Sequence, residues 1–321
     1  MKRKQLIVPL FVVLTFGISL EIFSLTVHEK MPAAQFSVSF SSTPTPYLIP
    51  QRTYAQTSTL QKILQQVFAP RNSRDSYAEL LATSHKELTS EHFELYVQEN
   101  YLPVDAATWM VDAEQVYAED SSRINSALTG KVILLFSPVK TEKCAARGTT
   151  YHENLPLILI YADRDTSQKQ IMATLAHELG HVLIAQKYPE LSSVALNEGM
   201  ATWVAKDYWQ SWKNESLDDA VRRFLREGSY LPLVQNLEME KAYAQSEDCI
   251  QNRDILLTEF ASFTDYLIRT YGMDKLAVLF DIPQPEFVNN SRVVDPPDFY
   301  GVYGLQLNQL ENAWLVELSA Q

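Results

Sequence analysis

The stretch LAHELGHVL, residues 175–183, decides how the rest of the chain is interpreted. It places His177 and His181 four residues apart, with Glu178 directly after the first histidine. Residues four apart share one face of an α-helix, so both imidazoles would point to the same position. The flanking residues are apolar, which predicts a buried helix. Because burying a polar group without a partner costs free energy, we expect a metal ion between the two rings.

A second predicted helix supplies the ligand that the first one lacks. The segment ALNEGMATWV, residues 195–204, follows a helix stop at Pro189 and contains Glu198. A hairpin of two helices can return this carboxylate to the histidines. A catalytic zinc takes three protein ligands and leaves a position open for water. We therefore predict one Zn²⁺ held by His177, His181 and Glu198, with Glu178 as general base.

The motif HELGH followed by LNEGMATW resembles the gluzincin zinc metallopeptidases, and most of all their peptidase-MA-like group with a thermolysin-like core. The resemblance is specific at these two motifs and looser over the rest of residues 92–318. It implies an α+β zincin fold, in which a small mixed β-sheet and the zinc helix precede a mostly helical C-terminal subdomain. It also implies peptide-bond hydrolysis by zinc-activated water. Tyr243, in AYAQS, is a candidate oxyanion donor, and a packed core tyrosine is the alternative.

Three details of the resemblance need separate expectations. Thermolysin-type members place an aspartate where this chain has Thr202. We therefore expect either another group, such as Asp163 or Asp207, to orient a ligand histidine, or a site that manages without this aspartate, as in the aminopeptidase-type gluzincins. The resemblance also makes the strand predicted at residues 155–163 the sheet edge that pairs with an extended peptide. Glu153-Asn154 match two residues of an aminopeptidase motif, and chance explains so short a match.

The N-terminus predicts a targeting segment. Lys2, Arg3 and Lys4 precede an apolar run from Leu6 to Leu20, which suits a signal peptide or a signal anchor over residues 1–30. Residues 31–59 are rich in Ser, Thr and Pro and predict a linker. The peptidase-MA-like domain would span 60–321, with an α/β subdomain at about 60–190 and a helical one at 191–321. The positive-inside rule places this domain outside the cytoplasm, anchored at the membrane or secreted if the signal is cleaved.

Charge and cysteine content narrow the partners. The net charge is −12, which disfavours nucleic acid as a partner because no basic surface would neutralise phosphates. The expected partners are a peptide or protein substrate and, through the N-terminal segment, the membrane. Cys144 and Cys249 are the only cysteines. In an oxidising compartment they can form a disulfide, and two unpaired buried thiols are the alternative.

Two other functions fit parts of the pattern. A catalytically inactive gluzincin-fold module, anchored at the membrane for binding or scaffolding, would keep the fold without turnover. Peptide deformylases also use H-E-x-x-H, but they take a cysteine as third ligand, and the residues around Cys144 lack their motif. Glu178→Gln separates the first alternative from a peptidase, because it should abolish turnover and keep the zinc.

The remaining elements are predicted from periodicity and capping residues. Strands are expected at residues 92–97 and 131–136. Helices are expected at 60–81 with a break at Pro70, and at 106–128, 195–212, 217–227, 254–271, 274–280 and 307–318.

Overall fold

The computed structural model describes residues 76–98, 101–153, 155–189, 191, 193–239, 248–280, 286–288, 291–293 and 297–320. The predicted targeting segment, the linker and Tyr243 lie outside these residues. Within the described part of the chain, no helix is long and apolar enough to cross a membrane.

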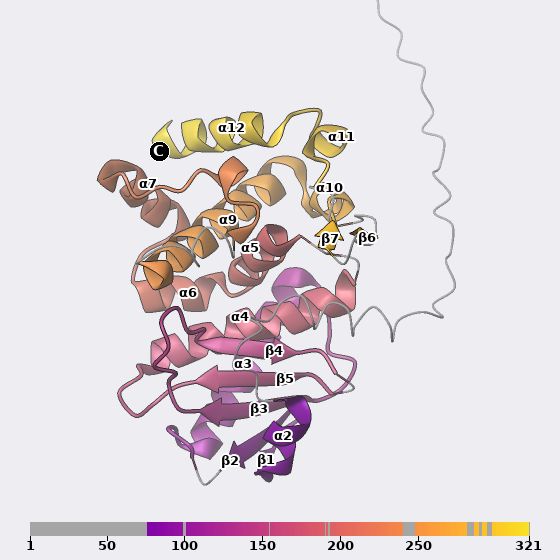
Figure 1. Cartoon of the computed structure of the whole chain (residues 1–321), viewed down its shortest axis with the longest axis vertical. Coiled ribbons are helices and arrows are strands. Elements are labelled where there is room, and N and C mark those ends of the chain that lie inside the picture. Colours follow the sequence, from indigo (N-terminus) through magenta and orange to yellow (C-terminus); the bar gives the residue numbers. More distant parts are fainter. Residues whose placement is uncertain are drawn as a thin grey trace, which may run out of the picture. The chain divides into compact units, whose positions relative to one another are not determined.

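The sheet has five strands in the order β1-β2-β3-β5-β4. The three inner strands run parallel, and the two edge strands, β1 and β4, each pair antiparallel with their neighbour (Figure 1). With helices before, between and after the strands, the fold is α+β, as predicted. The strands are β1 (Ser84–Thr89), β2 (Phe93–Gln98), β3 (Val132–Ser137), β4 (Gly148–Tyr151) and β5 (Leu157–Tyr161).

The apolar runs of β3 and β5 arise because both faces of the sheet are covered. Alternate residues such as Leu134 and Ile158 belong to the main core, which α3 (Ala106–Ile124) and α4 (Gln168–Lys187) close on one face. Their neighbours in sequence belong to a smaller cluster on the other face, where α2 (Tyr77–Ala82) contributes Leu80.

The edge of the sheet differs from the prediction. Residues 155–163 were expected to form the edge strand, but β5 is an inner strand between β3 and β4. The edge is the short strand β4, with the sequence GTTY, which the sequence analysis did not predict. Four residues with one aromatic side chain carry too little alternation to mark a strand, whereas β5 is apolar throughout.

The C-terminal half is mostly helical (Figure 1). The single helix expected at residues 195–212 is two helices that meet at Ala205. The carbonyl of Val204, the last residue of the first helix, accepts a hydrogen bond from the Arg123 guanidinium of α3. The helix expected from Asp254 begins earlier, at Cys249. The elements are α5 (Val194–Val204), α6 (Lys206–Lys213), α7 (Leu217–Glu227), η1 (Leu233–Gln235), α9 (Cys249–Tyr271), α10 (Met273–Val278), β6 (Glu286–Val288), β7 (Ser291–Val293), α11 (Phe299–Tyr303) and α12 (Leu307–Ala320).

A disulfide joins the two halves of the fold. Of the two alternatives for the cysteines, the structure has Cys144 bonded to Cys249, with their Cα atoms 5.5 Å apart. Cys144 lies in the loop before β4, and Cys249 is the first residue of α9. The edge strand is thereby tied to the longest helix of the C-terminal half.

Candidate metal centre

Helix α4 carries the HELGH motif through the core. The Ser167 side chain caps its N-terminus by accepting the Gln170 N–H, and every residue from Ile171 to Ile184 is buried. The helix is therefore buried all round, as its apolar flanks predict. The exposed fractions of His177, Glu178 and His181 are only 7%, 8% and 9%. Polar groups buried this deeply need partners inside the protein.

Two glycines allow α5 to approach α4 closely enough to supply a ligand. A Cβ at Gly180, on α4, would lie 3.1 Å from backbone atoms of Ala201 on α5. On the other side of α5, a Cβ at Gly199 would lie 2.9 Å from the Phe260 carbonyl of α9. Helix α5 is thus packed between α4 and α9 so closely that a side chain at either glycine would be crowded against the backbone of the neighbouring helix. The residue before Gly199 is Glu198, which this packing directs towards α4.

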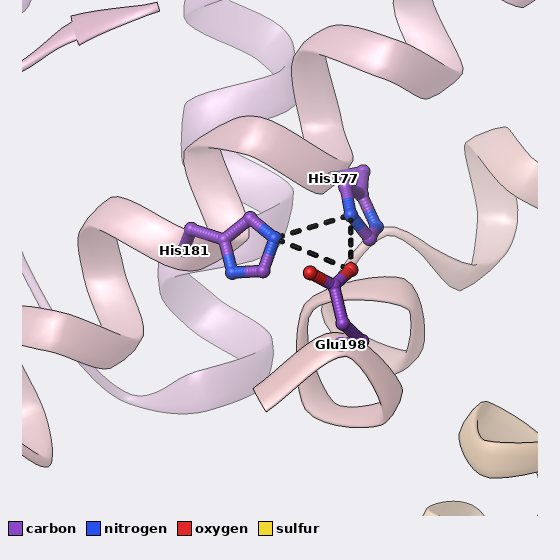
Figure 2. A group of neighbouring side chains, drawn as sticks. All are labelled: His177, His181 and Glu198. Carbon is purple, nitrogen blue, oxygen red and sulfur yellow. Dashed lines mark hydrogen bonds and ion pairs between the residues drawn. The ribbon is translucent and has the colours of Figure 1, made fainter. Parts of the chain in front are cut away.

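The three predicted ligands meet at one point. Figure 2 shows the two imidazoles and the carboxylate turned towards one another from α4 and α5. The Nε2 atoms of His177 and His181 lie 3.1 Å apart, and Oε2 of Glu198 lies 3.1 Å and 3.6 Å from them respectively. Ligand atoms at about 2.0–2.1 Å from a tetrahedral zinc are about 3.3–3.4 Å from one another. The observed separations fit this geometry.

The outer ring nitrogens are held by two residues of α5. Asn197 Oδ1 lies 3.2 Å from Nδ1 of His181, and Thr202 Oγ1 lies 3.0 Å from Nδ1 of His177. An amide oxygen only accepts, so Nδ1 of His181 carries a proton and Nε2 is the ring atom that can bind a metal. If Thr202 accepts in the same way, Nε2 of His177 is likewise the atom turned to the centre. A proton or a metal cation at the centre would satisfy the two rings and the carboxylate.

The orienting residues are therefore not the ones we expected. Asp207 pairs with Arg123, and Asp163 accepts the Thr166 hydroxyl within its own turn. Thr202 occupies the position of the missing aspartate, and its neutral hydroxyl contacts His177. Neither aspartate contacts a ligand histidine, and none is needed, because any acceptor within reach can hold the Nδ1 proton.

The electrostatics of the cluster favour bound positive charge. Burial alone would lower the pKa of His181, but the neighbouring Glu198 carboxylate outweighs it and raises that pKa to about 9. Burial conversely favours the neutral form of Glu198, yet the two histidines hold the pKa of its carboxyl well below the usual range. The site thus keeps an ionised, partly buried carboxylate beside the two histidines, which suits a divalent cation.

Glu178 is held on the side of α4 that faces the edge strand. The hydroxyl of Thr150, on β4, donates to its Oε2 at 2.7 Å. Its other oxygen, Oε1, lies under Gly148, where a Cβ would come within 2.6 Å. The contacts of Gly148 and Thr150 with Glu178 were not predicted from the sequence. The local sequence shows only a glycine followed by two threonines.

Two polar residues follow directly after β4. Burial, and to a smaller extent His181, lower the pKa of His152 to about 4, so its ring is neutral near pH 7. The Glu153 carboxylate lies close enough to Tyr77 of α2 to affect its charge: burial raises the pKa of Tyr77, and the negative charge of Glu153 raises it further. Helix α2 covers the face of the sheet opposite to α4. The short aminopeptidase match at Glu153 therefore gives no support for exopeptidase action.

Comparison with known protein families and with curated proteins finds no match for this sequence. The chemistry of the site must therefore be judged from its own geometry.

Proposed function

We propose that the chain is a zinc metallopeptidase of the gluzincin, peptidase-MA-like type, with His177, His181 and Glu198 as ligands of one Zn²⁺. The observation that carries the proposal is the mutual spacing of the three ligand atoms, 3.1, 3.1 and 3.6 Å. Three ligands also leave a position for water, which distinguishes catalytic from closed structural zinc sites. The HELGH and NEG motifs support a zincin-like arrangement of the catalytic domain.

The chain's own groups suit hydrolysis of a peptide bond. A bound zinc ion would supply Lewis acidity and a water of lowered pKa. Glu178 is the group that would take the proton from the attacking water and return it to the leaving amine. Its carboxylate is buried beside the ligands and already held by Thr150. Tyr243 stays a prediction for the oxyanion donor.

Strand β4 is the proposed binding edge for the substrate. It ends the sheet and packs against α4 at Glu178. An extended peptide can add to a sheet edge through main-chain hydrogen bonds, which do not depend on the side chains of the peptide. This assigns to β4 the role that the sequence analysis gave to residues 155–163.

The proposed location is outside the cytoplasm, with residues 1–30 as a membrane anchor or as a signal that is cleaved. The Cys144–Cys249 disulfide supports this proposal, because such bonds persist in oxidising compartments.

Zinc content and turnover together test the function. The full chain should hold about one zinc per molecule by elemental mass spectrometry, and Glu198→Ala should lose it. Glu227→Ala, at the exposed end of α7, is the matched control and should keep it. Glu178→Gln should keep zinc and lose cleavage of a peptide library. A wild-type protein that holds zinc but cleaves no peptide would favour the inactive binding module. A folded protein that takes up no zinc from a zinc-containing buffer would refute the peptidase and leave an anchored module without a metal.

A further inference from the structure

Strand β4 leaves a specific place for the Glu178 carboxylate. A Cβ built at Gly148 would lie 2.6 Å from Oε1 and 2.7 Å from Cγ of Glu178, and 2.8 Å from Cγ2 of Thr174. Real side chains do not approach so closely, so the glutamate fills the space that any other residue at position 148 would need. One oxygen of the carboxylate thus occupies space that is open only because residue 148 is glycine.

The second oxygen is fixed by a hydrogen bond from the same strand. The Thr150 hydroxyl lies 2.7 Å from Oε2 of Glu178 and 3.1 Å from its backbone oxygen. A hydroxyl donor to an ionised carboxylate makes a charge-assisted bond, which is stronger than a bond between neutral groups. Glutamate has several rotatable bonds, so a contact at each oxygen removes most of the conformations that the side chain would otherwise sample.

The strand that holds Glu178 is itself anchored. Arg147, the residue before β4, makes a paired contact of 2.6 and 2.9 Å with the Asp254 carboxylate of α9. Arg253 donates to the carbonyls of Cys144 and Ala145 in the same loop. The disulfide adds a covalent link to the start of α9.

Helix α9 therefore serves two parts of the site. Through the anchored loop it fixes β4, which holds Glu178. Through its close packing at Gly199 it also fixes α5, which carries Glu198. The proposed base and the third ligand are thereby positioned by contacts with the same helix. Supporting contacts of this kind keep reacting groups within a fraction of an ångström of a productive geometry.

We propose that Thr150 is a positioning residue for the general base, and that its hydroxyl fixes the orientation of the Glu178 carboxylate. The proposal rests on the proposed peptidase function. Thr150 does not take part in proton transfer. Its hydroxyl keeps Oε2 in one place, so that the carboxylate faces the attacking water in most molecules rather than in a few. Displacing a reacting group by about 1 Å can cost about 100-fold in rate.

Two substitutions at position 150 and one at the end of α2 test this role in the full chain. Thr150→Val removes the hydroxyl and keeps the branched shape, and kcat should fall about 10- to 100-fold with KM within about twofold. Thr150→Ser restores the donor and should recover most of kcat. Thr83→Val is the control, because the Thr83 hydroxyl donates to the Glu79 carbonyl of α2 and lies outside both the ligand cluster and the proposed binding edge. Zinc content should be unchanged in all three variants.

A structural measurement keeps the inference separate from the function. In crystal structures, Thr150→Val should show the Glu178 carboxylate rotated or spread over several conformers, and Thr83→Val should show it unmoved. Thr150→Ala replaces Thr150→Val if the valine variant does not fold. If no variant and no wild-type protein cleaves peptides, the proposed function fails, and the crystal structures still decide on Thr150. An unmoved Glu178 carboxylate in Thr150→Val, or an unchanged kcat of Thr150→Val when the wild-type protein is active, overturns the inference.

Discussion

Glu259, in the middle of α9, makes the stability of the fold depend on pH. Its side chain is fully buried, Oε1 accepts the Leu231 N–H at 3.1 Å, and Oε2 has no partner among the described residues. Burial, with a smaller contribution from Glu311, raises the pKa of Glu259 to about 9 from an ordinary 4.5. At neutral pH the folded protein therefore binds a proton here that the unfolded chain releases.

The sign and size of the effect follow from this proton. Between the unfolded pKa of 4.5 and the folded pKa of about 9, only the folded state binds it. The stability from this group is thus fully present below 4.5 and decreases as the pH rises towards 9. One proton corresponds to about 1.4 kcal/mol of unfolding free energy per pH unit. From pH 6 to pH 8 the wild-type protein should lose roughly 2.7 kcal/mol relative to a variant that cannot titrate.

Glu259→Gln is that variant, because an amide has nearly the shape of the protonated acid and keeps an acceptor for Leu231. Urea unfolding of both proteins at pH 6 and pH 8 gives the four free energies needed. Every other titrating group contributes alike to both proteins, so their difference isolates Glu259. The difference should grow in favour of the variant as the pH rises. Two curves that stay parallel across this range would show that the carboxyl ionises in the folded state and refute the reasoning.

Three further predictions concern the site and its support. In Gly148→Ala the new Cβ would lie 2.6 Å from Oε1 of Glu178, so the carboxylate should move by about 0.8 Å to reach an ordinary contact distance. This shift should lower kcat about 100-fold while zinc is kept. Activity assays and zinc analysis of the purified variant check this. Thr202→Val removes the acceptor at the first ligand histidine and should weaken zinc binding about 10- to 100-fold in chelator competition, with Thr202→Ser close to wild type. Reduction of the Cys144–Cys249 bond should lower the unfolding free energy by up to about 4–5 kcal/mol, and a double serine variant should respond to no reductant.

The parts of the fold that follow a strong local pattern were predicted well. The HELGH helix, α4, has a capping serine, fourteen consecutive buried residues and a spacing of four between its histidines, and it lies where a buried helix was predicted. The continuous apolar strands β3 and β5 and the capped helix α7 were also found where expected. In each case the residues that form the element also carry the pattern that predicts it.

The missed features depend on contacts between distant segments. Strand β4 forms because β5 offers a partner, not because GTTY is a strong strand sequence. At the break at Ala205, the Val204 carbonyl accepts from Arg123, a residue more than eighty positions earlier. Likewise Thr150 is assigned a role only because β4 lies over Glu178. A position inside a sheet, such as that of β5, is a property of its neighbours and cannot be read from its own residues.

The disulfide has a consequence for the integrity of the molecule under proteolysis. Cys144 and Cys249 are 105 positions apart in the sequence, and the segment between them contains β4, β5, α4 and α5, and so all three proposed ligands together with Glu178 and Thr150. These residues lie in a covalently closed ring. A single backbone cut anywhere within it, by any protease, opens the ring but releases no fragment. On a non-reducing gel the nicked protein would still migrate as one chain, and only reduction would separate its two pieces.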